Sequence, residues 1–324
     1  MKKFLAAALC IALLAGALSG CGAAADPVAD GRLSIVTTIF PIYDWVNQII
    51  GGDSESVDVT LLLDKGIDLH NYQATADDMI KISTCDMFIY VGGESDRWVA
   101  DALSEATNRE MVVIDLLQLL GDQAKEEEVV EGMQGDEDHG EEDERGESGY
   151  DEYVWLSLKN ASFFCQYISE QLCGIDGEHT GTYEANTTTY VEQLSALDLE
   201  YQQAVDSAAR DTVLFGDRFP FRYLVDDYGL NYYAAFVGCS AETEASFETI
   251  TFLAGKVDEL RLDTIMQIET SDGSIPNTIK QSTAAKDQTI LTMNSLQSTT
   301  SSEGGTTYLS VMRDNLEVLR EALR

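Results

Sequence analysis

From residue 33 onward the chain alternates short apolar runs with amphipathic helical segments, and this alternation restricts the fold more than any other feature. Strand-like runs such as 33–38 and 86–91 precede helix-like runs such as 41–50 and 97–107. Strands that alternate with helices form parallel sheets, because each helix carries the chain back across the sheet. We therefore expect an α/β protein whose sheets are covered on both faces.

The alternation occurs twice, on either side of one long helical segment. Residues 180–210 carry tyrosines and leucines at helical spacing, whereas 33–179 and 211–324 each contain several strand-like runs. We expect two parallel-sheet α/β lobes joined by one long linking helix, with a ligand cleft between the lobes. A helix is a stiff connection, so the expected relative motion of the lobes is small.

A strongly acidic segment, residues 122–152, interrupts the N-terminal lobe. It contains fourteen acidic residues from Glu126 to Glu152, several glycines and a single histidine, His139. Such a composition cannot bury enough apolar surface to fold by itself, so we expect a mobile acidic loop. It either collects metal ions or serves as a solvated spacer, and carboxylates alone bind zinc loosely.

The N-terminus has the features of an export signal. A short basic start is followed by an apolar run, residues 4–18, that is too short to span a membrane, and then by Leu18-Ser19-Gly20-Cys21. Residues 1–21 therefore resemble a bacterial lipoprotein signal peptide with a lipobox, and 22–32 read as a flexible tether. We expect an extracytoplasmic protein anchored to the cell membrane through acylated Cys21. The alternative is an ordinary secretory signal with an incidental cysteine.

Charge and motifs exclude several classes of function. A formal net charge of −37 leaves no basic face for nucleic acid. The sequence contains no phosphate-binding loop, no HExxH motif and no supported nucleophile–base pair. We therefore expect that the protein is not an enzyme, and in particular not a hydrolase that uses His70. No CxxC spacing is present, so we expect buried thiols rather than a thiolate cluster at four cysteines: Cys85, Cys165, Cys173 and Cys239.

His70 is one of only three histidines, and it follows the strand-like run 57–63 directly. Ligands of parallel α/β sheets bind in the crevice beyond the carboxyl ends of the strands. A neutral imidazole at that place is a good ligand for a divalent transition metal. The alternative is a surface-loop histidine without a ligand.

Several short segments, taken together and in order, resemble one family: the zinc and manganese solute-binding lipoproteins of ABC importers that have a rigid linking helix. The resemblance covers nearly all of the chain after the signal segment. The segments are the lipobox, Phe40-Pro41-Ile42-Tyr43, His70-Asn71-Tyr72, Tyr90-Val91-Gly92-Gly93, Trp155-Leu156-Ser157, Leu194 to Asp198 and Thr307 to Leu316. The resemblance implies a monomer that captures Zn²⁺ or Mn²⁺ between its lobes and delivers the ion to a membrane permease.

In that family four side chains, two from each lobe, hold the ion, and this chain matches the pattern only in part. His70 matches the first ligand. Tyr153 stands where the family has a second histidine, and a phenol ligates zinc only if it ionises, which its ordinary pKa of about 10 makes costly. Glu152 or Asp151 is an alternative oxygen ligand for the metal. A further alternative is that Tyr153 packs against its neighbours and does not bind metal.

The two ligands expected from the second lobe also differ. Gly216 has no side chain to offer, so Asp217 inherits the third role unless it caps the following helix. Asn294 stands at the fourth position, where it offers an amide oxygen without charge. Three acids are kept as alternative ligands or as hydrogen-bond support for the ligands: Glu152, Glu242 and Glu269.

The resemblance thus predicts an oxygen-rich site that leans towards manganese more than the usual zinc-binding member. The alternative function keeps the fold but not the site. Tyr153, Gly216 and Asn294 then reflect a drifted site that binds a chelated or small organic ligand, or a surface interaction protein of the kind used in cell adhesion.

Overall fold

The computed structural model describes residues 31–53, 55–134, 149–240, 244–302 and 304–324. Leu33–Arg324 forms one compact unit, separate from the preceding Met1–Arg32. The predicted lipobox with Cys21 and most of the predicted tether lie outside the described residues, as do His139 and Glu242. All the structural statements below concern the compact unit.

The first lobe is built on a parallel sheet of four strands in the order β2-β1-β3-β4. Its central strand, β1, pairs with both β2 and β3 and is buried at its carboxyl end. The strands and helices of this lobe are β1 Leu33–Thr37, α2 Phe40–Ile50, β2 Val57–Leu61, η1 Leu69–Asn71, α3 Ala76–Thr84, β3 Met87–Tyr90, α4 Val99–Ser104, β4 Val112–Asp115, α5 Leu116–Leu120 and η2 Gly121–Gln123.

The second lobe repeats this plan with the sheet order β6-β5-β7-β8, again all parallel. The register of β5 against β6 shifts between Phe215 and Arg218, so β5 bends where the candidate ligand Asp217 lies. The elements of this lobe are β5 Thr212–Phe219, α8 Arg222–Tyr228, β6 Asn231–Val237, α9 Phe247–Leu260, β7 Thr264–Ile268, α10 Ser274–Ser282, β8 Thr289–Met293 and α11 Tyr308–Ala322.

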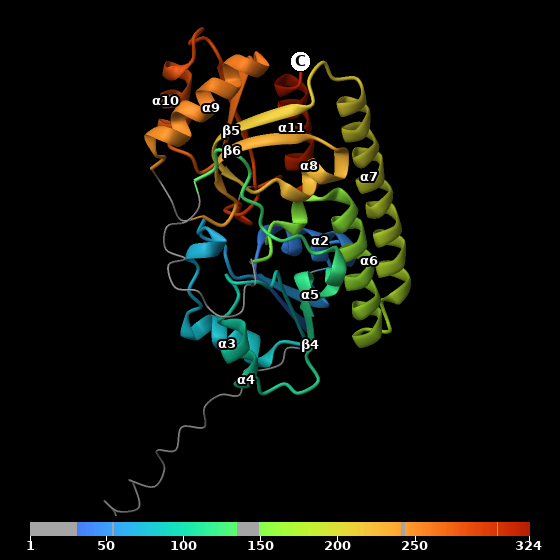
Figure 1. Ribbon diagram of the computed structural model, residues 1–324. Coiled ribbons are helices and arrows are strands. Elements are labelled where there is room, and N and C mark those ends of the chain that lie inside the picture. Colours follow the sequence, from blue (N-terminus) through green and yellow to red (C-terminus); the bar gives the residue numbers. More distant parts are fainter. Residues whose placement is uncertain (1–30, 54, 135–148, 241–243, 303) are drawn as a thin grey trace, which may run out of the picture. The chain divides into compact units, whose positions relative to one another are not determined.

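Two antiparallel helices join the lobes, after the short helix η3 (Val154–Leu156). They are α6, Leu158–Ile175, and α7, Thr180–Asp206, and they pack along each other (Figure 1). At 1.5 Å per residue, the 27 residues of α7 span about 40 Å. α7 contacts α2 of the first lobe and α8 and α11 of the second. The predicted fold class, two parallel-sheet lobes with a long linking helix, is confirmed.

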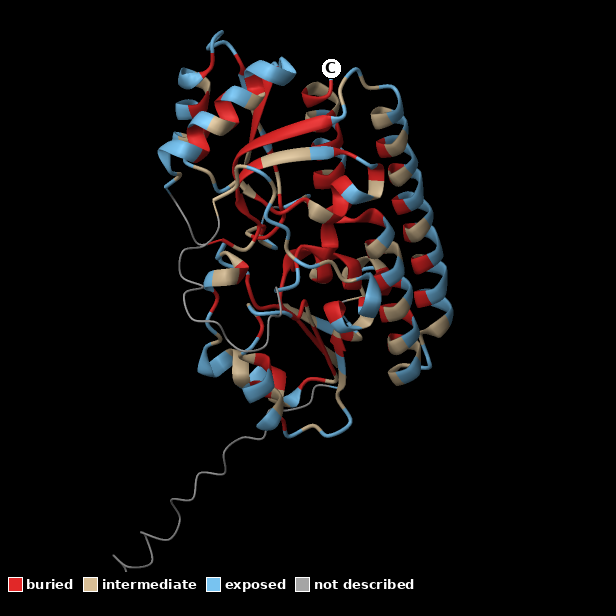
Figure 2. Ribbon diagram, in the orientation of Figure 1, coloured by how far each residue is buried: buried red, intermediate tan, exposed pale blue. Residues whose placement is uncertain are grey.

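The lobes share one continuous hydrophobic core in addition to the linking helix (Figure 2). Trp45 on α2 is fully buried between Phe164 of α6 and Tyr308 of α11, with ring centroids 5.9 and 5.3 Å away. The Tyr308 hydroxyl donates to the backbone oxygen of Trp155 at 2.6 Å. The last helix of the chain is therefore anchored in the first lobe, which stiffens the connection between the lobes.

The acidic segment differs from the expected mobile loop at both of its ends. Gln134 donates its backbone N–H to Ala235 in β6 at 2.9 Å, and the Lys125 N–H donates to the Tyr223 hydroxyl at 2.9 Å. Ion pairs add to these bonds, such as Arg222 with Glu128 at 2.7 Å. Backbone pairing and ion pairs, which composition does not reveal, hold residues 124–134 on the second lobe.

Candidate metal centre

His70 lies in the short helix η1, which follows β2. The residues next to it in the sequence hold it in position. The Asp68 side chain accepts from the His70 backbone N–H at 3.0 Å, and Leu69 is buried. The imidazole has two further partners: Nε2 lies 2.8 Å from the Tyr153 hydroxyl, and Nδ1 lies 2.6 Å from Ser95 Oγ. Burial lowers the pKa of His70 to about 4, so the ring is neutral at pH 7.

Tyr153 contacts His70 from a fully buried position. Its hydroxyl lies 3.0 Å from the Gly238 carbonyl oxygen and 2.9 Å from Gln297 Oε1, besides His70 Nε2. Burial raises the pKa of Tyr153 well above its usual range, so the phenol keeps its proton. The structure therefore places this predicted ligand as a hydrogen-bond partner of His70, with its oxygen occupied by three neighbours.

The third predicted ligand, Asp217, is engaged with backbone groups. Its carboxylate accepts from the Arg218 N–H at 2.8 Å and the Ile268 N–H at 3.4 Å. The alternative that Asp217 caps the next helix is wrong, because α8 begins at Arg222 with Phe221 as its N-cap. The bend in β5 directs Asp217 into these backbone bonds instead.

Gly216 is closed to any side chain. A Cβ built there would lie 2.7 Å from the Pro276 Cα of α10 and 2.9 Å from the Pro276 Cβ. Arg218, two residues after Gly216, carries a positive charge, and its Nη2 pairs with Asp68 Oδ2 at 2.9 Å. This ion pair joins the second lobe to the loop that carries His70.

The fourth predicted position, Asn294, shapes a loop. Its Oδ1 accepts from the Leu296 N–H at 2.7 Å, where the backbone adopts a positive φ of 64°. Glu269 accepts from the backbone and side chain of Ser295, each at 2.8 Å. Together they place Gln297 against Tyr153, so Glu269 supports the site through the loop. Sequence reasoning missed Gln297, which no local pattern distinguishes.

Glu152 lies beside the imidazole of His70. Its Oε1 accepts from the Ser95 N–H at 2.9 Å, and its Oε2 lies 3.5 Å from His70 Nδ1. This Oε2 is buried and has no hydrogen-bond partner among the described residues. Burial raises the pKa of Glu152 above its usual range. A buried acceptor without a donor is costly, so a cation at this point would be stabilised.

Cys239, directly after β6, completes a cluster that sequence reasoning did not find. One ligand atom each of His70, Glu152 and Cys239 lies within 4.8 Å of the others. The expectation that all four cysteines are buried is wrong for Cys239 and Cys173, which are partly exposed. The position of Cys239 at the carboxyl end of a strand was the available signal.

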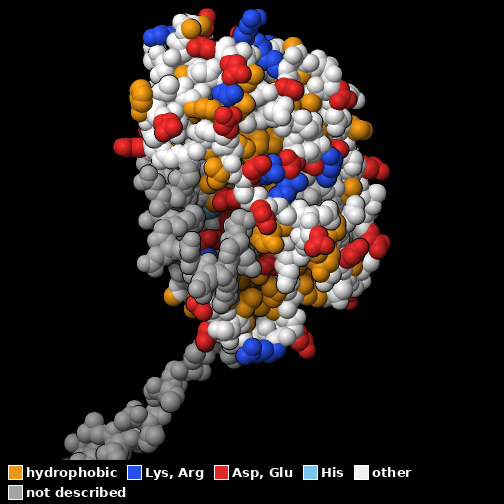
Figure 3. All heavy atoms as spheres, in the orientation of Figure 1, with side chains coloured by type: hydrophobic (Ala, Val, Ile, Leu, Met, Phe, Trp, Pro, Cys, Tyr) orange, Lys and Arg blue, Asp and Glu red, His pale blue; other side chains and the backbone are white. Residues whose placement is uncertain are grey.

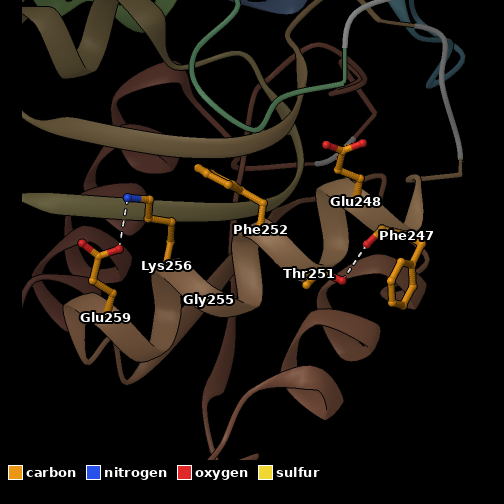
Figure 4. A pocket seen from close by; sticks show the side chains of 7 residues that line it. All are labelled: Phe247, Glu248, Thr251, Phe252, Gly255, Lys256 and Glu259. Carbon is orange, nitrogen blue, oxygen red and sulfur yellow. Dashed lines mark hydrogen bonds and ion pairs between the residues drawn. The ribbon is translucent and has the colours of Figure 1, made fainter.

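A separate apolar hollow lies on the outer side of α9 and is a different kind of surface. Figure 4 shows its seven lining residues, none of which is a histidine or a cysteine. Lys256 and Glu259 form an ion pair at 3.1 Å, and Phe247 is 86% exposed. Among the described residues, the group of three side chains that could hold a metal ion is the one around His70.

The acidic character of the chain is visible on its surface. Figure 3 shows acidic side chains spread over the face in view, with fewer basic ones. Among the described residues, no helix is long and apolar enough to cross a membrane. Fold and site together define a two-lobed α/β protein that has a histidine–carboxylate site where the lobes meet.

The comparison with known families agrees with this class. The family model described as zinc-uptake complex component A, periplasmic, matches residues 35–322. The chain belongs to this family, and the predicted recognition is confirmed.

Curated relatives and solved structures are similar over most of the chain. The zinc-binding lipoprotein AdcA of Streptococcus pneumoniae serotype 4 is 31% identical over 299 residues, which are 90% of this chain and 56% of that protein. This chain thus spans just over half the length of AdcA. The high-affinity zinc uptake system protein ZnuA of Bacillus subtilis is 26% identical over 323 residues, 99% of this chain and 96% of that one.

Two solved structures illustrate the likeness. The Zn(II)-bound ZnuA-like domain of S. pneumoniae AdcA has a TM-score of 0.70 at 26% identity, covering 90% of this chain and 99% of that one. A mutant of the laminin-binding adhesin Lmb of Streptococcus agalactiae has a TM-score of 0.73 at 22% identity, covering 90% and 100%. The second likeness concerns the fold alone.

Proposed function

We propose that this protein is the extracytoplasmic metal-binding component of an ABC importer, that it captures a divalent transition metal between its lobes, and that zinc is its cargo. The observation that carries the proposal is the neutral imidazole of His70 beside the buried Oε2 of Glu152, which has no hydrogen-bond partner among the described residues. Family membership and the zinc-binding names of its relatives support it. The protein acts by binding and delivery, without catalysis.

The proposed function also includes a membrane anchor and a membrane partner. Acylated Cys21 anchors the chain to the outer face of the cell membrane, and a metal permease in that membrane receives the ion. The protein works as a monomer. Residues 33–179 and 211–324 serve as the two lobes, with 180–210 as their link.

Calorimetric titration tests the proposal on the chain that begins after Cys21, which retains the whole compact unit Leu33–Arg324. We expect one tight zinc site, which is lost in His70→Ala. His179→Ala is the matched control, because His179 is paired with Asp176 at 2.8 Å at the start of α7. Only weak, multiple binding that is equal in both variants would assign the metal to the acidic segment and refute the proposal.

One observation favours a second candidate, a chelated metal as cargo. Arg218 brings a guanidinium next to His70, where it opposes a bare cation but suits the anionic groups of a chelator. Titration with zinc alone and with preformed zinc–citrate separates the two. A complex that binds more tightly than the free ion would support the second candidate.

A further inference from the structure

We propose that His70 Nδ1, Glu152 Oε2 and the Cys239 sulfur hold the metal ion, so that a thiolate takes the place of the ligands missing at positions 153, 216 and 294. This inference rests on the proposed function and specifies its ligands. It assigns one ligand, Cys239, to the second lobe, and two, His70 and Glu152, to the first. It also changes the expected preference from manganese to zinc.

The distances suit a tetrahedral site. Bond lengths of about 2.0 Å to nitrogen or oxygen and 2.3 Å to sulfur place neighbouring donors about 3.3 to 3.6 Å apart. His70 Nδ1 and Glu152 Oε2 are already 3.5 Å apart, and one ligand atom from each of His70, Glu152 and Cys239 lies within 4.8 Å of the other two. A small inward shift of Cys239 therefore completes three corners of a tetrahedron, and water fills the fourth.

The hydrogen bonds around Tyr153 favour the tautomer of His70 in which Nδ1 is free, because two oxygen acceptors compete with Nε2 for the one Tyr153 proton. The Tyr153 hydroxyl has one proton, and the Gly238 carbonyl at 3.0 Å can only accept it. When the Tyr153 proton goes to Gly238 or to Gln297 Oε1, 2.9 Å away, His70 Nε2, 2.8 Å from the same hydroxyl, donates its own proton. A neutral imidazole has a single N–H, so Nδ1 presents its lone pair to Ser95 Oγ and towards Glu152.

This leaves two acceptors facing each other without a shared proton. The Nδ1 lone pair lies 3.5 Å from Glu152 Oε2, which is buried and has no hydrogen-bond partner among the described residues. Ser95 Oγ donates to Nδ1 in this state and can rotate away when an ion arrives. A cation held by both atoms would satisfy these two acceptors.

Charge balance favours a thiolate as the third ligand. The Arg218 charge is offset by Asp68, its partner at 2.9 Å. A divalent ion with Glu152 and the Cys239 thiolate is also neutral in total, whereas a histidine with neutral oxygen ligands would bury two positive charges. Binding replaces the S–H bond of Cys239 with a metal–sulfur bond, and the proton goes to the buffer.

The backbone before Cys239 allows the thiol to come this close. A Cβ at Gly238 would lie 2.9 Å from the Tyr153 ring and 3.1 Å from the Phe219 carbonyl oxygen. Glycine therefore lets the end of β6 pack directly on Tyr153. Thiolate ligands favour zinc over the harder manganese ion, so the site is selective for zinc.

The test compares Cys239→Ser with Cys173→Ser, a control at a partly exposed cysteine on α6, in the chain that begins after Cys21 under reducing conditions. We expect Cys239→Ser to weaken zinc binding on the order of 100-fold, measured by competition with a chromophoric chelator, and to change manganese binding little. Cobalt should give a thiolate-to-metal charge-transfer band in the parent and in Cys173→Ser, but not in Cys239→Ser.

Two further readouts keep the result unambiguous. Titration in buffers of different ionisation enthalpy should show about one fewer proton released per zinc ion in Cys239→Ser. Unchanged thermal unfolding of the metal-free variants would show that the fold is intact. Zinc binding lost in His70→Ala but retained at parental affinity in Cys239→Ser overturns this ligand set while the proposed function stands. Absence of tight zinc binding in the parent itself overturns both.

Discussion

The unfolding free energy of the Asp96→Asn variant, relative to that of the parent, should be greater at neutral pH than at acidic pH. Asp96 lies in the loop between β3 and α4 that carries Ser95, and it is 4% exposed. Its Oδ2 accepts from the backbone N–H groups of Val91 and Gly92, both at 3.0 Å, whereas Oδ1 has no partner among the described residues. Burial raises its pKa from 3.8 to about 7.

The size of the effect follows from the difference between the pKa of Asp96 in the folded state and in the unfolded state. A raised pKa contributes stability that is present below the unfolded value and lost as the pH rises through the folded value. About three pKa units at roughly 1.4 kcal/mol each correspond to about 4 kcal/mol in total. Between pH 5 and pH 8 the part that is lost amounts to about 2.5 kcal/mol. Asp96→Asn keeps an oxygen for both N–H groups and cannot ionise.

Urea denaturation of the metal-free protein at pH 5, 6, 7 and 8 measures the effect. The unfolding free energy of Asp96→Asn minus that of the parent should rise by about 2.5 kcal/mol across this range. Asp101→Asn, at an exposed position on α4, serves as the control for the loss of a carboxylate in the same region. A difference for Asp96→Asn that does not change with pH would refute the reasoning.

Three further outcomes test the packing and the charge of the site. Gly216→Ala should lower the unfolding free energy by about 1 to 3 kcal/mol, because its Cβ would meet α10 at 2.7 Å, whereas Gly255→Ala, which meets nothing within 4 Å, should not destabilise. Asp44→Ala removes the acceptor of the buried Tyr308 N–H, at 3.0 Å, and should cost about 1 to 3 kcal/mol in urea denaturation. Arg218→Met removes a cation near the bound metal and should lower the zinc dissociation constant about five- to tenfold in chelator competition; an unchanged or higher constant would contradict the assigned role of Arg218.

Local patterns in the sequence were sufficient for the architecture. Alternating apolar runs predicted the parallel strands of both lobes, and helical spacing predicted α7, although that helix ends at Asp206 rather than at 210. These features depend on residues a few positions apart, where periodicity and propensity act directly. The loop position of His70 beyond β2 was accessible for the same reason, as was the family resemblance.

The composition of the site was decided by the tertiary structure. Tyr153 and His70 are 83 positions apart, and Gln297 reaches Tyr153 across 144. The closure of Gly216 by Pro276 and the approach of Cys239 to His70 likewise depend on how distant loops pack. No local pattern encodes such contacts, because each joins residues that are far apart in the sequence.

The sequence by itself determined two α/β lobes, a long linking helix and one histidine at a strand end. Only the tertiary structure decided which side chains surround that histidine and that the ends of the acidic segment pack on the folded protein. The physical reason is range: secondary structure follows from neighbouring residues, whereas a binding site is assembled from side chains that the chain brings together over long separations.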